Sequence, residues 1–193
     1  MTEKNNEIKH RIKKELDNDR YQHTLGVAYT ASCLAMRYGA DIDDAFTAGL
    51  LHDCAKCIPT PEKLKLCEKY GIELTDIEIN NPALIHAKLG AFLAEHKYGI
   101  TDKDIINAVR THTTGEPAMS LLQKIIFTAD YIEPRRDHAR NLPEIRQLAF
   151  TDIDSAIRQI LHDTLNYLNT KSAAVDLQTS HTYEYYLRIT EDK

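Results

Sequence analysis

The chain has 193 residues, which is enough for one domain with a buried core. Lysine and arginine number 24 and aspartate and glutamate 29, so the formal net charge is −5, which disfavours sequence-independent nucleic-acid binding because such binding depends on neutralising phosphates. Seven glycines and six prolines are few for a turn-rich all-β domain, and no apolar run approaches the roughly 20 residues that cross a bilayer. The composition therefore predicts a globular, helical protein with no nucleic-acid and no membrane partner.

An apolar period of about 3.6 residues runs through nearly the whole chain and predicts an all-α fold of about eight to ten helices in one domain. The helices predicted in the first half cover, in order, residues around 8–16, 25–39, 41–52 and 61–71, and residues 72–82 are expected to be a loop. The helices predicted in the second half cover residues around 83–98, 102–112, 119–132 and 152–167, and a last helix in the final twenty residues.

The dipeptide His52-Asp53 lies at the end of the predicted third helix. A neutral imidazole and a carboxylate are both ligands that first-row metal ions accept. Adjacent residues on a helix point about 100° apart, so both can reach one ion only near a helix end or with the ion lying between two faces of the helix. The dipeptide alone is weak evidence, because a histidine on an apolar helix is more often a residue of the core or the surface.

Other predicted helices also place a metal-ligand residue on an inward face: His23, His86, His112 and Asp130. Asp130 follows Leu122 and Ile126 on one apolar stripe, where an unpaired carboxylate is costly to bury and needs a partner or a metal ion. A single such residue is explained by a hydrogen bond in the core. Together they predict a metal site inside a helical bundle.

The order His23, His52-Asp53, His86, His112 and Asp130 resembles the HD domain, a helical fold of metal-dependent phosphohydrolases. Three segments resemble the YqeK branch of that superfamily, which hydrolyses diadenosine tetraphosphate symmetrically to two ADP: Leu50–Lys56, His112–Gly115 and Ala129–Arg136. The resemblance implies one HD domain over residues 1–193. Its core would cover about residues 15–170, with the tyrosine-rich C-terminal segment docked on it.

The resemblance implies a divalent metal ion with four ligands: His23, His52, Asp53 and Asp130. Mixed imidazole and carboxylate ligands suit Fe first, with Mn, Co or Zn as alternatives, better than Ca or Mg. The implied reaction is attack of metal-bound hydroxide on an inner phosphorus of the tetraphosphate bridge. His86 and His112 bind either an optional second metal ion or phosphate oxygens, with one of them protonating the leaving ADP, and we favour phosphate contact.

Phosphoryl transfer needs positive charge around the phosphates. Lys56 lies one helical turn after His52, Arg136 has the planar fork that suits phosphate, and Thr113 offers a hydroxyl donor, although each is also explained as a surface or helix-end residue. The predicted catalytic residues are Asp53, Lys56, His86 and His112. The predicted substrate-binding residues are His23, Asp53, Lys56, His86, His112, Thr113, Asp130 and Arg136. Arg20 and Arg135 are not included.

Two alternatives remain open at this point. Four histidines and two aspartates can also hold two irons, as in an HD-type di-iron oxygenase. The second alternative is a non-catalytic nucleotide-sensing HD domain, although a decayed site is expected to lose some ligands and the full set is present here. Lys56 and Arg136 favour the hydrolase, with a dinucleoside polyphosphate substrate or its ADP product as the small-molecule partner. The charged residues 1–19 contain no apolar stretch of a signal peptide, so a cytoplasmic location is expected. A homodimer is suggested by the aromatic tail.

Overall fold

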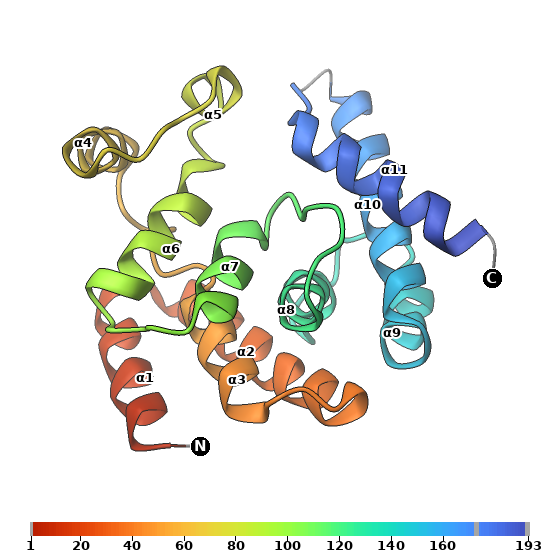
Figure 1. Cartoon of the computed structure of the whole chain (residues 1–193), viewed down its shortest axis with the longest axis horizontal. Helices are drawn as coiled ribbons and strands as arrows, with labels where there is room; N and C mark the ends of the chain where they lie inside the picture. The colour runs from red at the N-terminus through yellow and green to blue at the C-terminus, as the bar shows by residue number, and fades with distance from the viewer. Residues whose placement is uncertain (1, 172–173, 192–193) are drawn as a thin grey trace.

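The structure is a computed structural model that describes residues 2–171 and 174–191, and within these residues it contains helices and no strands (Figure 1). The helices of the described residues are α1 (Glu3–Glu15), α2 (Asn18–Tyr38), α3 (Ile42–Leu51), α4 (Thr60–Tyr70), α5 (Asp76–Asn80), α6 (Ile85–His96), α7 (Lys103–Thr111), α8 (Leu121–Ile132), α9 (Leu142–Thr151), α10 (Ile153–Thr170) and α11 (Leu177–Glu191). The all-α prediction is confirmed. None of the described helices combines the length and the apolar character that a membrane span requires.

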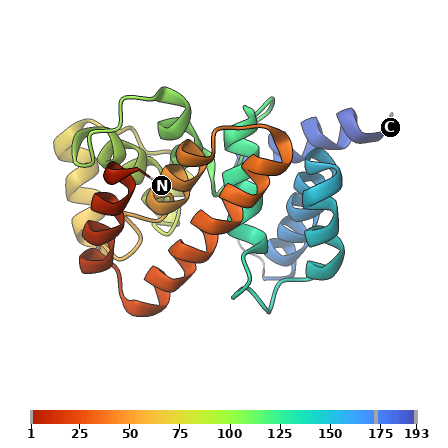
Figure 2. The ribbon, with the colours of Figure 1, turned by 90° about the horizontal axis from the view of Figure 1, so that it is seen from below.

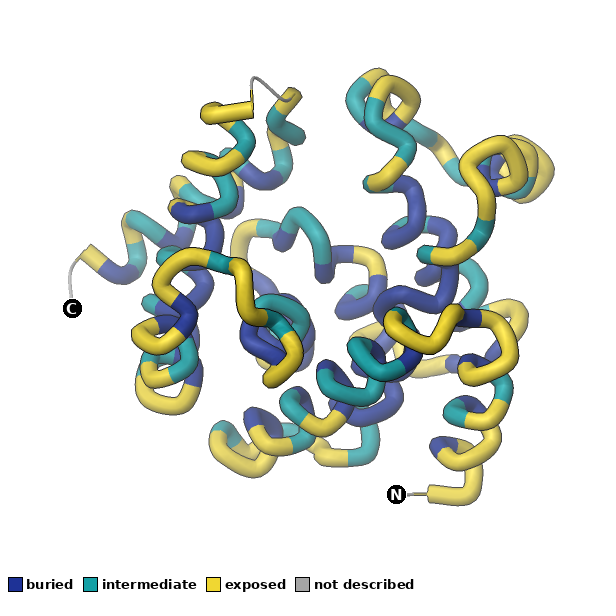
Figure 3. Tube along the Cα trace, turned by 180° about the vertical axis from the view of Figure 1, so that it is seen from behind, coloured by how far each residue is buried: buried dark blue, intermediate teal, exposed yellow. Residues whose placement is uncertain are grey.

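Helix α8 runs through the middle of the molecule, with α2, α3 and α7 on one side and α9 and α10 on the other (Figures 1 and 2). Its inward stripe is apolar at helical spacing, and Ile125, Ile126 and Ala129 are fully buried. The tube coloured by burial shows the same arrangement in the other helices, whose buried stretches meet at the centre of the molecule (Figure 3). Asp130 lies in the last turn of α8, which ends at Ile132. The central position of this helix therefore brings Asp130 close to the interior.

Helices α2 and α3 cross at very short distance. A Cβ atom on Gly49 would lie only 2.6 Å from the Cα atom of Ala28, so the crossing requires glycine at this position. The close approach places the ring of His23 on α2 beside the ring of His52 at the end of α3, with 5.4 Å between the ring centroids. The glycine is therefore part of the reason why two distant histidines meet.

Two helices are absent from the sequence prediction. The predicted loop 72–82 contains α5, which begins with a capping box in which Thr75 and Glu78 satisfy each other's backbone N–H groups. Helix α9, with Pro143 in its first turn, was not predicted at all. The described residues thus form eleven helices rather than the expected eight to ten, because short helices span few turns and leave little periodic signal.

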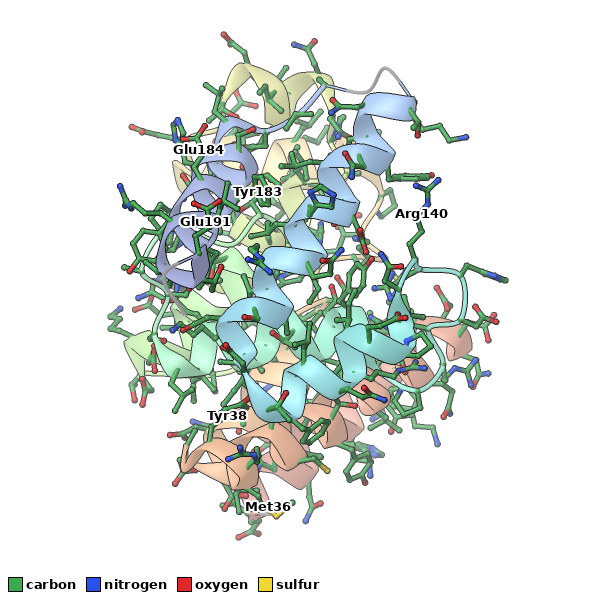
Figure 4. The ribbon with its side chains drawn as sticks, turned by 90° about the vertical axis from the view of Figure 1, so that its right-hand side faces the viewer. Met36, Tyr38, Arg140, Tyr183, Glu184 and Glu191 are labelled. Carbon is green, nitrogen blue, oxygen red and sulfur yellow. The ribbon has the colours of Figure 1, made fainter. Side chains whose placement is uncertain are left out.

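The C-terminal helix α11 packs along α10 (Figure 4). Tyr186 is fully buried, Tyr183 and Tyr185 are half-buried, and the hydroxyl group of Tyr183 lies 3.2 Å from Nδ1 of His162 on α10. These tail tyrosines therefore pack mainly within the chain. The homodimer expectation depends on aromatic residues exposed in the tail, and this reason is weakened; the homodimer stays a prediction. The boundaries of the predicted core, 15–170, stay a prediction.

Candidate metal centre

Five of the six predicted ligand residues lie at or near helix ends, and the sixth, His23, lies inside α2. His52 follows the last residue of α3, and Asp53 lies in the turn after it. His112 follows α7 in the same way, His86 is in the first turn of α6, and Asp130 is in the last turn of α8. Because α3 ends after Leu51, the adjacent residues His52 and Asp53 can face one centre.

The six predicted ligand residues form two groups, in each of which the ligand atoms lie within 4.8 Å of one another. One group contains His23, His52 and Asp130, and the other contains Asp53, His86 and His112. Each group combines imidazole nitrogen with carboxylate oxygen, which is the ligand mixture that divalent transition metals accept.

Asp53 connects the two groups, and its side chain is only 4% exposed. Its Oδ2 atom lies 3.6 Å from Nε2 of His52 and 3.9 Å from Nε2 of His23. Its Oδ1 atom lies 3.2 Å from Nε2 of His86 and 3.6 Å from Nε2 of His112. The two oxygens of one carboxylate therefore face different groups.

Three of the histidine rings are held by their own backbone. Nδ1 of His52, His86 and His112 lies 2.7, 2.5 and 2.7 Å from the carbonyl oxygen three residues earlier in each case. A carbonyl oxygen only accepts, so each Nδ1 carries the proton and donates it. The lone pair of each Nε2 is therefore directed to the cluster, in the tautomer that binds metal ions.

The residues present fit a bound cation. Nε2 of His23, Nε2 of His52 and Oδ1 of Asp53 are buried and have no hydrogen-bond partner among the described residues. Nε2 of His23 lies 3.0 Å from Oδ1 of Asp130, but two acceptors at that distance repel each other unless a proton or a metal ion lies between them. Buried acceptors without donors are costly, and a divalent ion at each group would satisfy the acceptors that face it.

The pKa values of these groups follow from burial and from the charges around them. Burial lowers the pKa of His52 and of His86 to about 4. Burial also acts to lower the pKa of His23, but the neighbouring carboxylates of Asp130, Glu133 and Asp53 outweigh it and raise the pKa above its ordinary value. Burial raises the pKa of the Asp53 and Asp130 carboxyl groups, yet the neighbouring imidazoles hold both well below 3.8.

The metal-free protein is expected to lose stability between pH 6.5 and pH 4. In this range the unfolded chain protonates His52 and His86 near their ordinary pKa of 6.5, whereas the folded chain keeps them neutral down to about pH 4. The free energy of unfolding then falls on the order of 2 kcal/mol per histidine from pH 7 to pH 5. His23, whose pKa is raised, adds stability that is lost only as the pH rises above 6.5. The two aspartates, whose pKa values are lowered, add stability that is lost only as the pH falls below about 3.8.

Urea unfolding of chelator-treated protein at pH 7 and pH 5 measures this loss. The double variant His52→Gln, His86→Gln should have a smaller pH dependence, whereas His138→Gln, which changes a histidine that is 96% exposed, should keep that of the parent chain. Equal stability of the parent chain at both pH values would contradict the prediction.

The predicted cations and hydroxyl group border the cluster. Nζ of Lys56 lies 3.2 Å from Nε2 of His86, and Nη2 of Arg136 lies 3.1 Å from Oδ1 of Asp130. Oγ1 of Thr113 lies 3.2 Å from Nε2 of His112. Each residue that the sequence analysis placed in the site is thus within contact distance of another member of the cluster.

Two residues outside the predicted set also contact the cluster. Nη1 of Arg20 lies 2.8 Å from Oδ2 of Asp53, and Oε1 of Glu133 lies 3.0 Å from Nδ1 of His23. Each lies three residues from a predicted ligand: Arg20 precedes His23 on the same helix, and Glu133 follows Asp130. Spacing of three or four on a helix places side chains side by side, and this signal could have identified both.

A cleft with a volume of about 990 Å³ opens beside the first group. It is lined by residues that include His23, Arg20, Arg136, Arg140 and Tyr167. Arg140 extends from the segment between α8 and α9 beside α10 (Figure 4). Arginine and tyrosine side chains can contact phosphate and a flat ring, and the cleft is large enough for a nucleotide. Its lining is mixed in charge, because it also contains carboxylates: Asp17, Asp19, Glu133, Asp137 and Asp163.

The comparisons with known proteins agree on one family. The HD domain model matches residues 20–135. The chain is 42% identical to the symmetrical bis(5'-nucleosyl)-tetraphosphatase of Bacillus subtilis (strain 168), over 90% of this chain and 92% of that protein. It is 34% identical to the protein of the same name from Staphylococcus aureus (strain NCTC 8325 / PS 47), over 90% of each chain.

A solved structure is similar over nearly the whole length. It is a crystal structure from Clostridium acetobutylicum, described as an HD superfamily hydrolase involved in NAD metabolism, with 38% identity and a TM-score of 0.92 over 96% of this chain and 97% of that one. The family match, the relatives and the shared fold agree with the cluster of histidine and aspartate ligands. The chain therefore belongs to the HD-domain family, together with these bacterial tetraphosphatases.

Proposed function

We propose that this protein hydrolyses diadenosine tetraphosphate symmetrically and releases two ADP. The observation that carries the proposal is a cluster of six imidazole and carboxylate side chains, divided by Asp53, with Lys56 and Arg136 at its border. The names of the relatives from Bacillus subtilis and Staphylococcus aureus support the same activity. Neither the di-iron oxygenase nor the non-catalytic domain is supported by the relatives reported above.

Four residues would hold the first ion: His23, His52, Asp53 and Asp130. A divalent transition metal ion, when bound there, supplies a Lewis acid and a water molecule of lowered pKa. Iron is the expected metal, with Mn, Co or Zn as alternatives. The deprotonated state of Asp53 and Asp130 at neutral pH, which follows from their lowered pKa values, is the state that binds cations.

His86 and His112 are better suited to a second ion than to phosphate. Their Nδ1–H groups already donate to the carbonyl oxygens of Ala83 and Val109, so their Nε2 atoms are acceptors. Phosphate oxygens are acceptors as well, and cannot bind an acceptor. This orientation supports the second-metal alternative over the phosphate contact that the sequence analysis favoured, with Oδ1 of Asp53 as the third ligand.

The cations supply the phosphate contacts. The Lys56 ammonium group and the Arg136 guanidinium group lie on different sides of the cluster, next to His86 and Asp130. Phosphoryl transfer is catalysed mainly by positioning and charge neutralisation, so these groups would orient the tetraphosphate bridge and stabilise the charge on the departing ADP. Thr113 can add a hydroxyl donor beside His112.

The products identify the reaction. Protein supplied with Fe²⁺ under anaerobic conditions, or with Mn²⁺, should convert diadenosine tetraphosphate to ADP as the sole nucleotide. AMP and ATP in equal amounts would show asymmetric cleavage and contradict the proposal, as would no turnover with either metal. Turnover without oxygen separates a hydrolase from an oxygenase, and calorimetric binding without turnover would favour the non-catalytic domain.

The small-molecule substrate follows from this activity. The metal identity, the cytoplasmic location and the homodimer stay predictions. Metal analysis of protein purified without added metal, and sedimentation of the purified chain, would test the first and the last.

A further inference from the structure

His23 differs from the other three histidines of the cluster in how its ring is held. It lies inside α2, and the hydrogen-bond partner of its Nδ1 atom comes from outside that helix. That partner is Oε1 of Glu133 at 3.0 Å, a carboxylate 110 residues away in the sequence. Among the four rings, only that of His23 has a side chain at Nδ1.

Glu133 is itself firmly held. The residue is only 2% exposed and follows the last residue of α8, where its backbone N–H group donates to the carbonyl oxygen of Ala129. Its Oε2 atom accepts from the backbone N–H group of Arg135 at 2.8 Å, and Arg146 donates to its carbonyl oxygen at 3.1 Å. The carboxylate therefore has one oxygen fixed by its own chain and the other directed to His23.

Gly26 provides the space for this carboxylate. It lies one helical turn after His23 on α2, and a Cβ atom there would overlap Oε2 of Glu133 and lie 3.2 Å from its Cδ atom. Glycine inside a helix costs about 1 kcal/mol relative to alanine, so its presence needs a reason. The reason here is room for Glu133.

We propose that Glu133 is a positioning residue that fixes the tautomer and orientation of His23 for metal binding, and that Gly26 makes room for it. A carboxylate acceptor keeps the proton on Nδ1, leaves Nε2 as a lone pair towards the centre, and makes that nitrogen more basic than a carbonyl acceptor does. The inference rests on the proposed function only in that a metal ion occupies the site. It concerns how the ion is held and requires no particular substrate.

The test is the zinc affinity of variants, measured by competition with a chelator, together with the Nδ1–H proton resonance of His23 in the zinc-loaded protein. Zinc is diamagnetic and therefore suits the second measurement. Glu133→Ala should lower zinc affinity about 10- to 100-fold and expose the Nδ1–H proton to exchange with solvent. Glu133→Gln keeps one oxygen that can accept from Nδ1–H but puts an NH2 group opposite the Arg135 N–H group, so it should recover part of the affinity and keep the resonance.

Gly26→Ala is an independent disturbance that leaves Glu133 in the sequence. Its added methyl group displaces the carboxylate, so the loss of zinc affinity should approach that of Glu133→Ala. Gly90→Ala is the matched control, because a Cβ atom there makes ordinary contacts of 3.4 and 3.5 Å with Val109 and Cys54, and its zinc affinity should match the parent chain.

Parent-like zinc affinity and a protected His23 proton in Glu133→Ala would overturn the proposal. If that variant does not fold, parent-like zinc affinity in Gly26→Ala would overturn the proposal equally. Zinc binding that responds as expected in a protein that does not cleave diadenosine tetraphosphate would contradict only the proposed function.

Discussion

Asp53→Asn is expected to lower kcat/KM for diadenosine tetraphosphate by about 1000-fold or more. The side chain keeps its shape but loses its charge, and its oxygens face both groups of the cluster at once. The new amide N–H group would also donate to one of the surrounding Nε2 lone pairs and block it for a metal ion. Both metal content and turnover should therefore fall together.

The matched control is Asp44→Asn in the first turn of α3, the helix that ends at Leu51 just before His52 and Asp53. Burial and neighbouring carboxylates already raise the pKa of Asp44, so neutralising it should leave metal content and kcat/KM near those of the parent chain. Metal analysis after desalting and initial rates over a substrate series make the comparison. An Asp53→Asn protein with parent-like metal content and rate would remove Asp53 from the centre.

Lys56→Met is expected to lower kcat about 100-fold while the metal content stays unchanged. Methionine keeps an unbranched side chain of similar length but lacks the ammonium group, which lies 3.2 Å from Nε2 of His86 and 3.9 Å from Oδ1 of Asp53. In our proposal this group neutralises phosphate charge and does not bind the ion. Loss of turnover without loss of metal is the signature that separates its role from that of Asp53.

Lys65→Met, on the exposed face of α4, serves as the control for removing a lysine charge. Its kcat should equal that of the parent chain. A Lys56→Met protein with unchanged kcat would contradict the phosphate role. Loss of metal in that variant would indicate that Lys56 instead holds the metal ligands His86 and Asp53 in position.

Much of the fold was predictable because helices are encoded locally. Apolar residues at a spacing of three and four, the cap at Asp41, and glycines such as Gly39 and Gly71 mark the long helices, and all three positions act as expected. Helix α9 is missing from the prediction although its buried residues follow a helical spacing: Leu142, Ile145 and Ala149. The sequence therefore does carry a signal for this helix, which packs against α10 and α8.

The helical class, the family and the residue types that face the centre can all be inferred from the amino-acid sequence. Burying an ionisable group on an apolar stripe, such as Asp130, costs free energy wherever the helix packs, unless a partner or a metal ion is present. How these groups are divided between two sets of ligands depends instead on the packing of the helices. The crossing of α2 and α3 at Gly49, and the direction in which α8 brings Glu133 to His23, depend on contacts between segments up to 110 residues apart. No local pattern records such contacts, because they are fixed by the packing of whole helices against one another.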